Sequence, residues 1–458
     1  GASAEERHVA RVLAGFQLAL PEDTRDLLAL TIAFRQPPAE DRLLEYLACP
    51  AVRHLVHEVW GRRYPPFTHR PEAWLAGQIQ ELVDLRLLER VGLDLGPAAP
   101  GTHPLLVLDA HPLVRRGFEH AGDGRGAAAR AGFLRGRPDR RPPASLAEAR
   151  EEVELFHAFC DAGLYNEADG VFLGLDNPKH RFLAPAFERD LLVRFFPGGD
   201  WRQPPLWPGF GRFRSLAICL EMLGQFDAAL DAYPARDAPL RGDALLALGR
   251  LQPFLDQPAV PHPWQALWQA YRVHALALAG RGRDALALAQ TLVPGDVYEW
   301  VHLVEALLRL GRLDLLDLNA LLYRSPLEVE HQWSRLARRR LHAEVLRLTA
   351  APAQNLEETW RGLLEEYDRA GLPLERAWTR LSLASFLHCQ QRSGMPDQQG
   401  EEIPALLTAA LDLARRHHLA IVEVDALEML TLTSGQNQWQ EAAGKLRAAV
   451  GYQGQGRP

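Results

Sequence analysis

The stretch Leu223-Gly224-Gln225-Phe226-Asp227-Ala228-Ala229 shows how most of this chain is built. It joins two segments in which Leu and Ala recur every three or four residues, which is the spacing of an amphipathic helix. Glycine readily adopts the positive φ that ends a helix, and the small Ala229 lets the next helix pack closely against the previous one. The stretch therefore predicts two antiparallel helices joined by a tight turn.

Related stretches recur around four other glycines, namely Gly163, Gly280, Gly311 and Gly371. With Gly224 included, successive glycines are 61, 56, 31 and 60 residues apart. A repeat of about 30 to 34 residues that is skipped at some places explains these intervals. We therefore expect a mainly α fold in which residues 147–450 form a series of helical hairpins.

The composition is that of a folded protein with several domains. Its 458 residues are 47% hydrophobic and carry a net charge of −7, which predicts two to four domains and argues against nucleic acid as a partner. No apolar run reaches the length of a membrane span. The four cysteines lie far apart, which favours reduced cytoplasmic thiols over disulfides or a zinc site. The chain starts Gly-Ala-Ser without a signal peptide, so we expect a cytoplasmic fragment with a short cloning remnant.

Residues 1–118 differ in organisation from the rest. Short amphipathic segments precede a longer helix over residues 71–90, and two apolar stretches at 88–93 and 105–108 suit a β-ribbon. A helical lead-in, three helices and a hairpin are the layout of a winged-helix domain. Four acidic residues against two arginines give the 71–90 helix a local charge of −2, which disfavours DNA binding.

Residues 119–146 are rich in Gly, Ala, Arg and Pro, and we expect them to form a basic linker. Between residues 114 and 141, eight Arg stand against three acidic residues. This excess predicts either a solvated connector or a segment that docks on an acidic neighbour. At the other end, residues 451–458 are expected to form a disordered tail.

One histidine stands where a phosphate could bind. In the stretch Leu105-Leu106-Val107-Leu108-Asp109-Ala110-His111-Pro112-Leu113-Val114-Arg115-Arg116, a strand-like run leads into the expected first turn of a helix. An imidazole at that place lies beside free backbone N–H groups and the positive end of the helix dipole. His111 is therefore a candidate nucleotide-sensing residue, and the alternative is a buried histidine that closes a strand–helix corner.

The turn phrase and its period resemble the tetratricopeptide repeat. An acidic winged helix, a strand leading into His111-Pro112-Leu113-Val114-Arg115 and a repeat array together resemble the C-terminal half of a STAND signal-transducing ATPase, the superfamily that includes plant NLR proteins. His111 stands where plant members carry Met-His-Asp, with Ala110 in place of the Met. The resemblance implies that His111 reaches the β-phosphate of bound ADP and holds a closed, inactive state.

The chain departs from that family in one respect. No G-x-x-x-x-G-K-[ST] phosphate loop occurs, and the Gly-Lys pair at residues 444–445 is followed by Leu. We therefore expect no cofactor and no enzymatic activity in this fragment, whereas ADP or ATP with Mg is implied for the full-length protein. G-x-S-x-G and H-E-x-x-H motifs do not occur either, and no metal site is expected.

The repeat resemblance implies a concave groove lined by the first helix of each pair. Charged and aromatic side chains there suit an extended peptide or a protein surface, and the alternative is an ordinary solvated face. The loop at residues 198–208 adds Trp201 and Trp207 as a candidate interface. The implied groove residues are Arg150, Val153, His157, Asp161, Gly211, Arg214, Ile218, Glu221, His274, Tyr298, Glu305 and Arg309.

These features predict the sensor and autoinhibitory region of a STAND-like ATPase in bacterial defence or signalling. Its partners would be a protein or peptide trigger and the missing ATPase domain. One alternative is a tetratricopeptide scaffold that assembles proteins without nucleotide control. Another is a fragment of a transcription regulator of the maltose-activator type, which needs a C-terminal DNA-binding domain that these residues do not contain.

Overall fold

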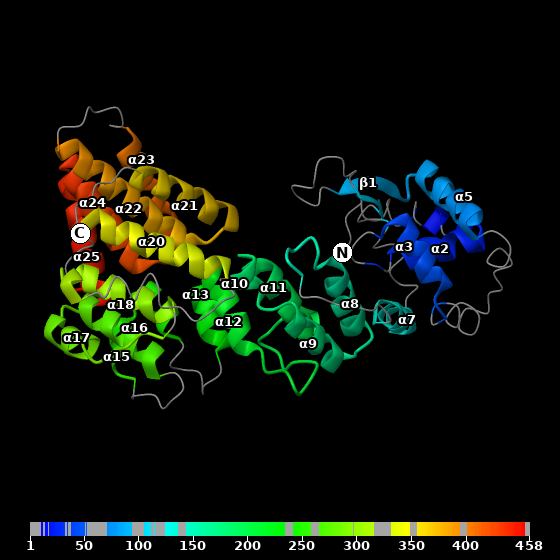
Figure 1. Cartoon of the computed structure of the whole chain (residues 1–458), viewed down its shortest axis with the longest axis horizontal. Coiled ribbons are helices and arrows are strands. Elements are labelled where there is room, and N and C mark those ends of the chain that lie inside the picture. The colour runs from blue at the N-terminus through cyan, green and yellow to red at the C-terminus, as the bar shows by residue number, and fades with distance from the viewer. Residues whose placement is uncertain are drawn as a thin grey trace. The chain divides into compact units, whose positions relative to one another are not determined.

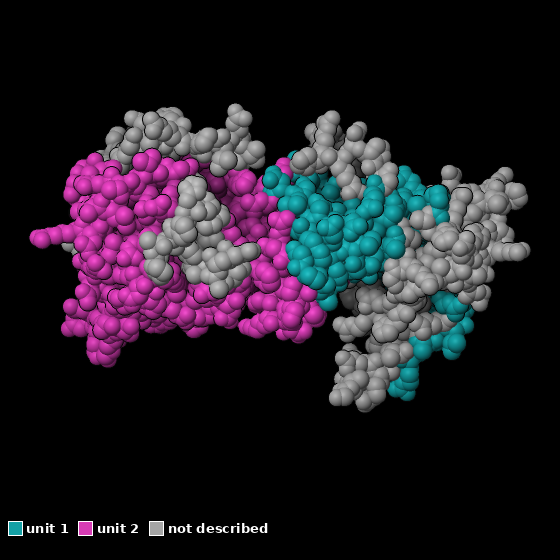
Figure 2. All heavy atoms as spheres, turned by 90° about the horizontal axis from the view of Figure 1, so that it is seen from below, with its two compact units in different colours: residues 1–176, 206–209 teal, residues 177–205, 210–458 magenta. Residues whose placement is uncertain are grey.

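The computed structural model of the chain is mainly helical, as the sequence predicts, and it divides into two compact units (Figure 1 and Figure 2). The first unit comprises residues 1–176 and 206–209, and the second comprises residues 177–205 and 210–458. The structure describes residues 11, 14–16, 18–32, 34, 38–50, 52, 71–93, 105–110, 114, 124–135, 143–233, 241–257, 265–295, 297–315, 331–348, 355–393 and 401–453.

The first unit begins with helices that pack on a small antiparallel ribbon. The helices are α2 (Glu22–Ile32), α3 (Glu40–Ala48) and α5 (Pro71–Asp84), and the strands are β1 (Glu89–Leu93) and β2 (Leu105–Asp109). Their shared core is formed by leucines of α2, α3, α5 and β2 and of the turn before β1, with Tyr46 and Ile79. Between α2 and α3, Ala39 forms an isolated antiparallel bridge with Val107 of β2. This bridge adds a third, very short strand position to the ribbon.

A helix occupies part of the expected linker, which corrects that prediction. Residues Gly124–Arg135 form α7, which packs against α8 (Arg150–Asp161), and α9 (Tyr165–Gly174) packs on α8 in turn. Arg130 of α7 is 2% exposed, and its guanidinium lies 2.9 Å from Asp161 and 3.3 Å from Glu154. Part of the basic excess is therefore neutralised inside the unit rather than solvated, because a buried guanidinium needs a counter-charge.

The second unit consists of helices that pack mostly against their sequence neighbours (Figure 1). The helices before residue 310 are α10 (Pro178–Arg181), α11 (Pro185–Leu192), α12 (Phe213–Met222), α13 (Phe226–Ala232), α14 (Gly242–Ala247), α15 (Leu251–Leu255), α16 (Gln265–Leu278), α17 (Gly282–Ala289) and α18 (Val297–Arg309). The later helices are α20 (Gln332–Leu348), α21 (Leu356–Ala370), α22 (Pro373–Arg392), α23 (Glu402–Arg416), α24 (Ala420–Ser434) and α25 (Asn437–Val450).

The predicted turn glycines do adopt the left-handed backbone. Their φ angles lie between +63° and +73° at Gly163, Gly224, Gly280, Gly311 and Gly371. The alanines five residues after the first three of these are fully buried, as close helix packing requires. A further turn at Gly249, with φ +69°, divides the 56-residue interval and was not recognised in the sequence. The helical-hairpin prediction is therefore confirmed at Gly163, Gly224, Gly280 and Gly371, where the helices on both sides of the turn are described and pack together. After Gly311 the structure describes only the short 3-10 helix Leu313–Leu315.

One hydrophobic core joins the earlier and later helices of the second unit. It includes Val304 of α18, Leu336 of α20 and Leu427 of α24. Two turn glycines, Gly224 and Gly249, take part in this packing, because a Cβ at either position would collide with later segments of the chain. A Cβ added at Gly249 would lie 2.9 Å from the Cβ of Val450, so a side chain there would collide with α25. In the part of the chain that the structure describes, no helix is long and apolar enough to cross a bilayer.

Candidate functional site

All the predicted groove residues except Gly211, which is exposed and precedes α12, lie on first helices of hairpins, but several are enclosed. Four of those in the second unit, on α12, α16 and α18, are at most 8% exposed, so they do not line an open groove as expected: Glu221, His274, Glu305 and Arg309. Arg214 of α12 and Tyr298 of α18 are half-buried. On α8 of the first unit, Arg150, His157 and Asp161 are also half-buried, whereas Val153 is buried.

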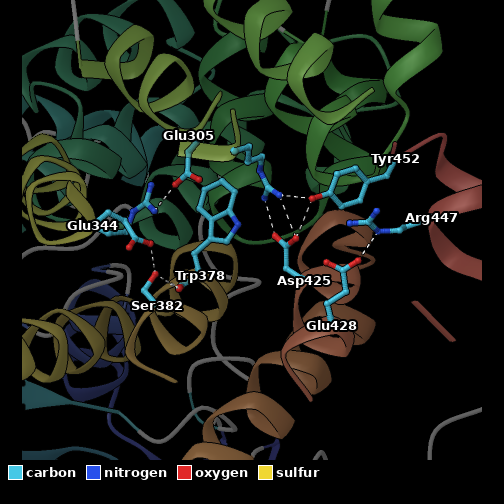
Figure 3. A network of polar contacts seen from close by, with 10 residues as sticks. Glu305, Glu344, Trp378, Ser382, Asp425, Glu428, Arg447 and Tyr452 are labelled. Atoms are coloured by element: carbon cyan, nitrogen blue, oxygen red, sulfur yellow. Dashed lines mark hydrogen bonds and ion pairs between the residues drawn. The ribbon is translucent and has the colours of Figure 1, made fainter. Parts of the chain in front are cut away.

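Glu305 and Arg309 belong to a buried ionic cluster that we call the arginine network: Glu305, Arg309, Arg340, Asp425 and Tyr452 (Figure 3). The Arg340 guanidinium of α20 lies 2.7 Å from a Glu305 oxygen, and these side chains are 2% and 0% exposed. Arg309 Nη2 lies 2.7 Å from Asp425 of α24, and its Nη1 donates to the Tyr452 hydroxyl at 2.6 Å. The charges of α18 are therefore neutralised by later segments of the same chain.

Charge pairing fixes the protonation of this network. Burial alone would lower the pKa of Arg309, but Asp425 and Tyr452 outweigh it, so the pKa stays above its ordinary value. Burial raises the pKa of Tyr452, whose hydroxyl therefore remains protonated at neutral pH. Arg309 therefore holds a fixed positive charge, and Tyr452 contributes a neutral hydroxyl beside it.

A second polar cluster, the acid–histidine cluster, comprises Glu221, Tyr233, Asp243, Tyr271 and His302. Tyr233 donates to Glu221 at 3.0 Å, while Asp243 accepts from Tyr271 at 2.9 Å and lies 2.8 Å from His302 Nε2. Burial, and next the charge of Asp243, raise the pKa of Glu221 well above its ordinary value. The other Glu221 oxygen, Oε1, has no hydrogen-bond partner, which also favours the neutral acid over the carboxylate. His274 extends this cluster, since its Nδ1 lies 3.2 Å from that of His302.

Tyr298 takes part in an aromatic contact rather than facing an open surface. Its ring stacks on Trp333 with centroids 4.3 Å apart, and its hydroxyl lies 2.8 Å from His180 Nε2. Burial, and then the charge of Lys179, lower the pKa of His180 well below its ordinary value. Lys179 itself forms a 2.7 Å buried pair with Glu188.

The space between α20, α22 and α24 is small. A cavity there is lined by two apolar residues, Leu381 and Met429, and by five polar ones: Glu344, Arg347, Ser382, Ser385 and Asp425. It measures about 10 Å³, which is near the lower limit for one water molecule. Ser382 donates to Glu344, and Arg347 lies 2.8 Å from Glu344, so its polar groups satisfy one another. This cavity cannot admit an organic substrate.

Trp201 and Trp207 are both half-buried. The Arg202 guanidinium lies 5.5 Å from the centre of the Trp201 ring, and the Trp207 ring lies close over Gly209. Their role as an interface remains a prediction. His111 lies outside the described residues, so its predicted role also remains a prediction. Within the described ranges, no group of three or more His, Cys, Asp or Glu side chains is arranged to hold a metal ion.

Sequence reasoning missed the later partners of the two clusters, among them Arg340, Asp425 and Asp243. A signal was present, because Asp425 stands directly between Val424 and Ala426 in a helix with a strongly apolar composition. A charge at such a position is rarely buried without a counter-charge. In comparisons with known proteins, no protein-family model, no curated protein and no solved structure matches this chain.

Proposed function

We propose that this chain is the sensor and autoinhibitory region of a STAND-like signalling ATPase, and that its helical repeats recognise a protein or peptide trigger. The observation that carries the proposal is the series of helix pairs whose two helices are joined by a turn with a left-handed glycine. Stacked helix pairs of this kind form tetratricopeptide-like solenoids, whose extended surfaces bind peptides and proteins.

The order of elements in the first unit supports the winged-helix part of the proposal. A winged helix runs helix, short strand, two helices and hairpin, and α2, Ala39, α3, α5 and β1–β2 follow that order. His111 would then follow directly after β2, where it would contact ADP held by an ATPase domain outside this chain. The nucleotide and Mg would belong to that domain, and the setting would be cytoplasmic signalling or defence.

The test is a binding measurement with a matched pair of variants. Proteins enriched by the tagged chain from cell extracts are identified by mass spectrometry, purified and titrated calorimetrically. Arg150→Glu changes a half-buried charge in the first turn of α8, a first helix. Arg283→Glu makes the same change at an exposed site in the first turn of α17, a second helix. An acidic residue suits both helix starts, so both variants should fold.

We expect Arg150→Glu to weaken binding of the trigger about tenfold and Arg283→Glu to leave it nearly unchanged, because a charge inside an interface matters more than one outside it. Circular dichroism and thermal melting serve as the control for folding. The proposal fails if no purified candidate binds, or if the two substitutions weaken binding equally.

A further inference from the structure

The residues after the last helix are seated in the second unit rather than disordered. Tyr452, expected in a disordered tail, is 2% exposed. Its hydroxyl accepts from Arg309 at 2.6 Å and lies 3.3 Å from Asp425, and the Arg447 guanidinium lies 4.5 Å from its ring centre. Figure 3 shows this side chain reaching toward Asp425 and the neighbouring arginine. Tyr452 thus fills a pocket whose walls carry charge on three sides.

Backbone contacts hold the same segment across a helix end. The Gln453 N–H donates to the Leu278 carbonyl at the end of α16, at 3.0 Å. Gly280, with φ +71°, lies directly beneath, since a Cβ there would be 3.0 Å from the Gln453 Cβ. We call residues 451–453 the strap. Beyond the capping bonds to α25, it contributes one backbone hydrogen bond to the end of α16 and one inserted aromatic side chain.

The strap follows directly on α25, since the N–H groups of Gly451 and Tyr452 both donate to the Arg447 carbonyl. Its buried side chain is one tyrosine, and Arg309 and Asp425 also pair directly with each other at 2.7 Å. The seat therefore keeps its charge balance when the strap leaves, and removing the strap does not strand a buried ion. A site of this kind can exchange one tyrosine for another at low cost.

From these contacts we propose that the seat of the strap is a recognition site for a protein segment carrying a tyrosine, which the chain's own Tyr452 occupies in cis. The proposal rests on the proposed function, because it names the class of segment that the helical repeats recognise and the way in which the site is kept closed. The tyrosine hydroxyl determines the specificity of the site, because it accepts a hydrogen bond from Arg309 and donates one to Asp425. A phenylalanine at the same place would leave both groups without this hydrogen bond.

The experiment measures binding of a fluorescent peptide with the sequence of residues 447–455 to the whole chain by fluorescence anisotropy. We expect Tyr452→Ala, which empties the seat, to bind this peptide at least tenfold more tightly than the native chain. A peptide with phenylalanine at the tyrosine position should bind about tenfold more weakly, the usual effect of losing a hydrogen bond to charged groups. Tyr233→Ala is the matched control, because Tyr233 is also a buried tyrosine bonded to a carboxylate but lies in the acid–histidine cluster.

If Tyr452→Ala does not fold, Tyr452→Phe carries the test. Its weakened strap should be displaced by the tyrosine peptide at about a tenth of the concentration that the native chain needs. The proposal is overturned if neither variant shows saturable binding, or if the phenylalanine peptide binds as well as the tyrosine peptide. In that case the proposed function still holds if a trigger binds Arg150→Glu more weakly than Arg283→Glu. Failure of this inference can therefore be told apart from failure of the proposed function.

Discussion

Removing one member of the Glu305–Arg340 pair should strongly destabilise the second unit. Both side chains are almost completely buried and lie 2.7 Å apart, and Arg340 also lies 5.0 Å from the centre of the Trp378 ring. Glu305→Gln keeps the shape and removes the charge, so Arg340 is left buried without its main counter-charge. Breaking a buried pair in this way costs about 3–5 kcal/mol. Asp284→Asn is the control, since Asp284 pairs with Arg281 at the surface with both side chains 53% exposed, and should cost only about 0.2–1 kcal/mol.

Urea unfolding followed by tryptophan fluorescence gives the free energy of unfolding for each variant. The double replacement Glu305→Met with Arg340→Met removes both charges, and we expect it to recover most of the loss, because apolar side chains of similar volume replace buried ion pairs at little cost. The reasoning is refuted if Glu305→Gln is no more destabilising than Asp284→Asn, or if the double replacement is as unstable as the sum of its parts.

Three further predictions concern pH, a turn and the nucleotide contact. Because the folded-state pKa of Glu221 is raised, the contribution of Glu221 to stability is complete below about pH 4.5 and is lost as the pH rises through the folded-state pKa. The urea concentration at the unfolding midpoint should therefore fall more steeply between pH 4.5 and 8 for the native chain than for Glu221→Gln. Equal slopes for the two proteins contradict this prediction. Gly224→Ala should lower the melting temperature more than Gly371→Ala: both turns have a positive φ, which costs about 1–2 kcal/mol, but only at Gly224 does a Cβ collide with His417 and Pro373. In the full-length protein that the resemblance implies, His111→Ala should raise basal signalling output, and an unchanged or lower output counts against the nucleotide clamp.

The hairpins were predictable because glycine at a helix end and a small residue five positions later are local features. Gly224 and Ala229 show both features within one short stretch of sequence. In the structure Gly224 has the expected positive φ, and Ala229 is buried as expected. The helix α7 was missed because its glycines and arginines resemble a linker, although its four alanines favour a helix. The pairing of Arg130 with Glu154 and Asp161 involves another helix and leaves no local signal.

The candidate site was predictable only in part, for the same reason. The sequence selected Glu305 and Arg309 as unusual charges on an apolar helix, but their partners Arg340 and Asp425 lie 35 and 116 residues away along the chain. No local pattern links such positions. Charged residues on the apolar helix α18 are therefore expected both for an open groove and for a buried ionic network. Only the packing of α20, α24 and the strap against α18 distinguishes the two.

The central claim, that the first helices of the hairpins form a recognition surface, is tested most directly by hydrogen–deuterium exchange of the purified chain with and without its purified partner. The account predicts that saturating partner slows exchange in first helices such as α8 and α12 and leaves the second helix α17 unchanged. Slowed exchange confined to second helices, or no change in any helix at saturation, contradicts it.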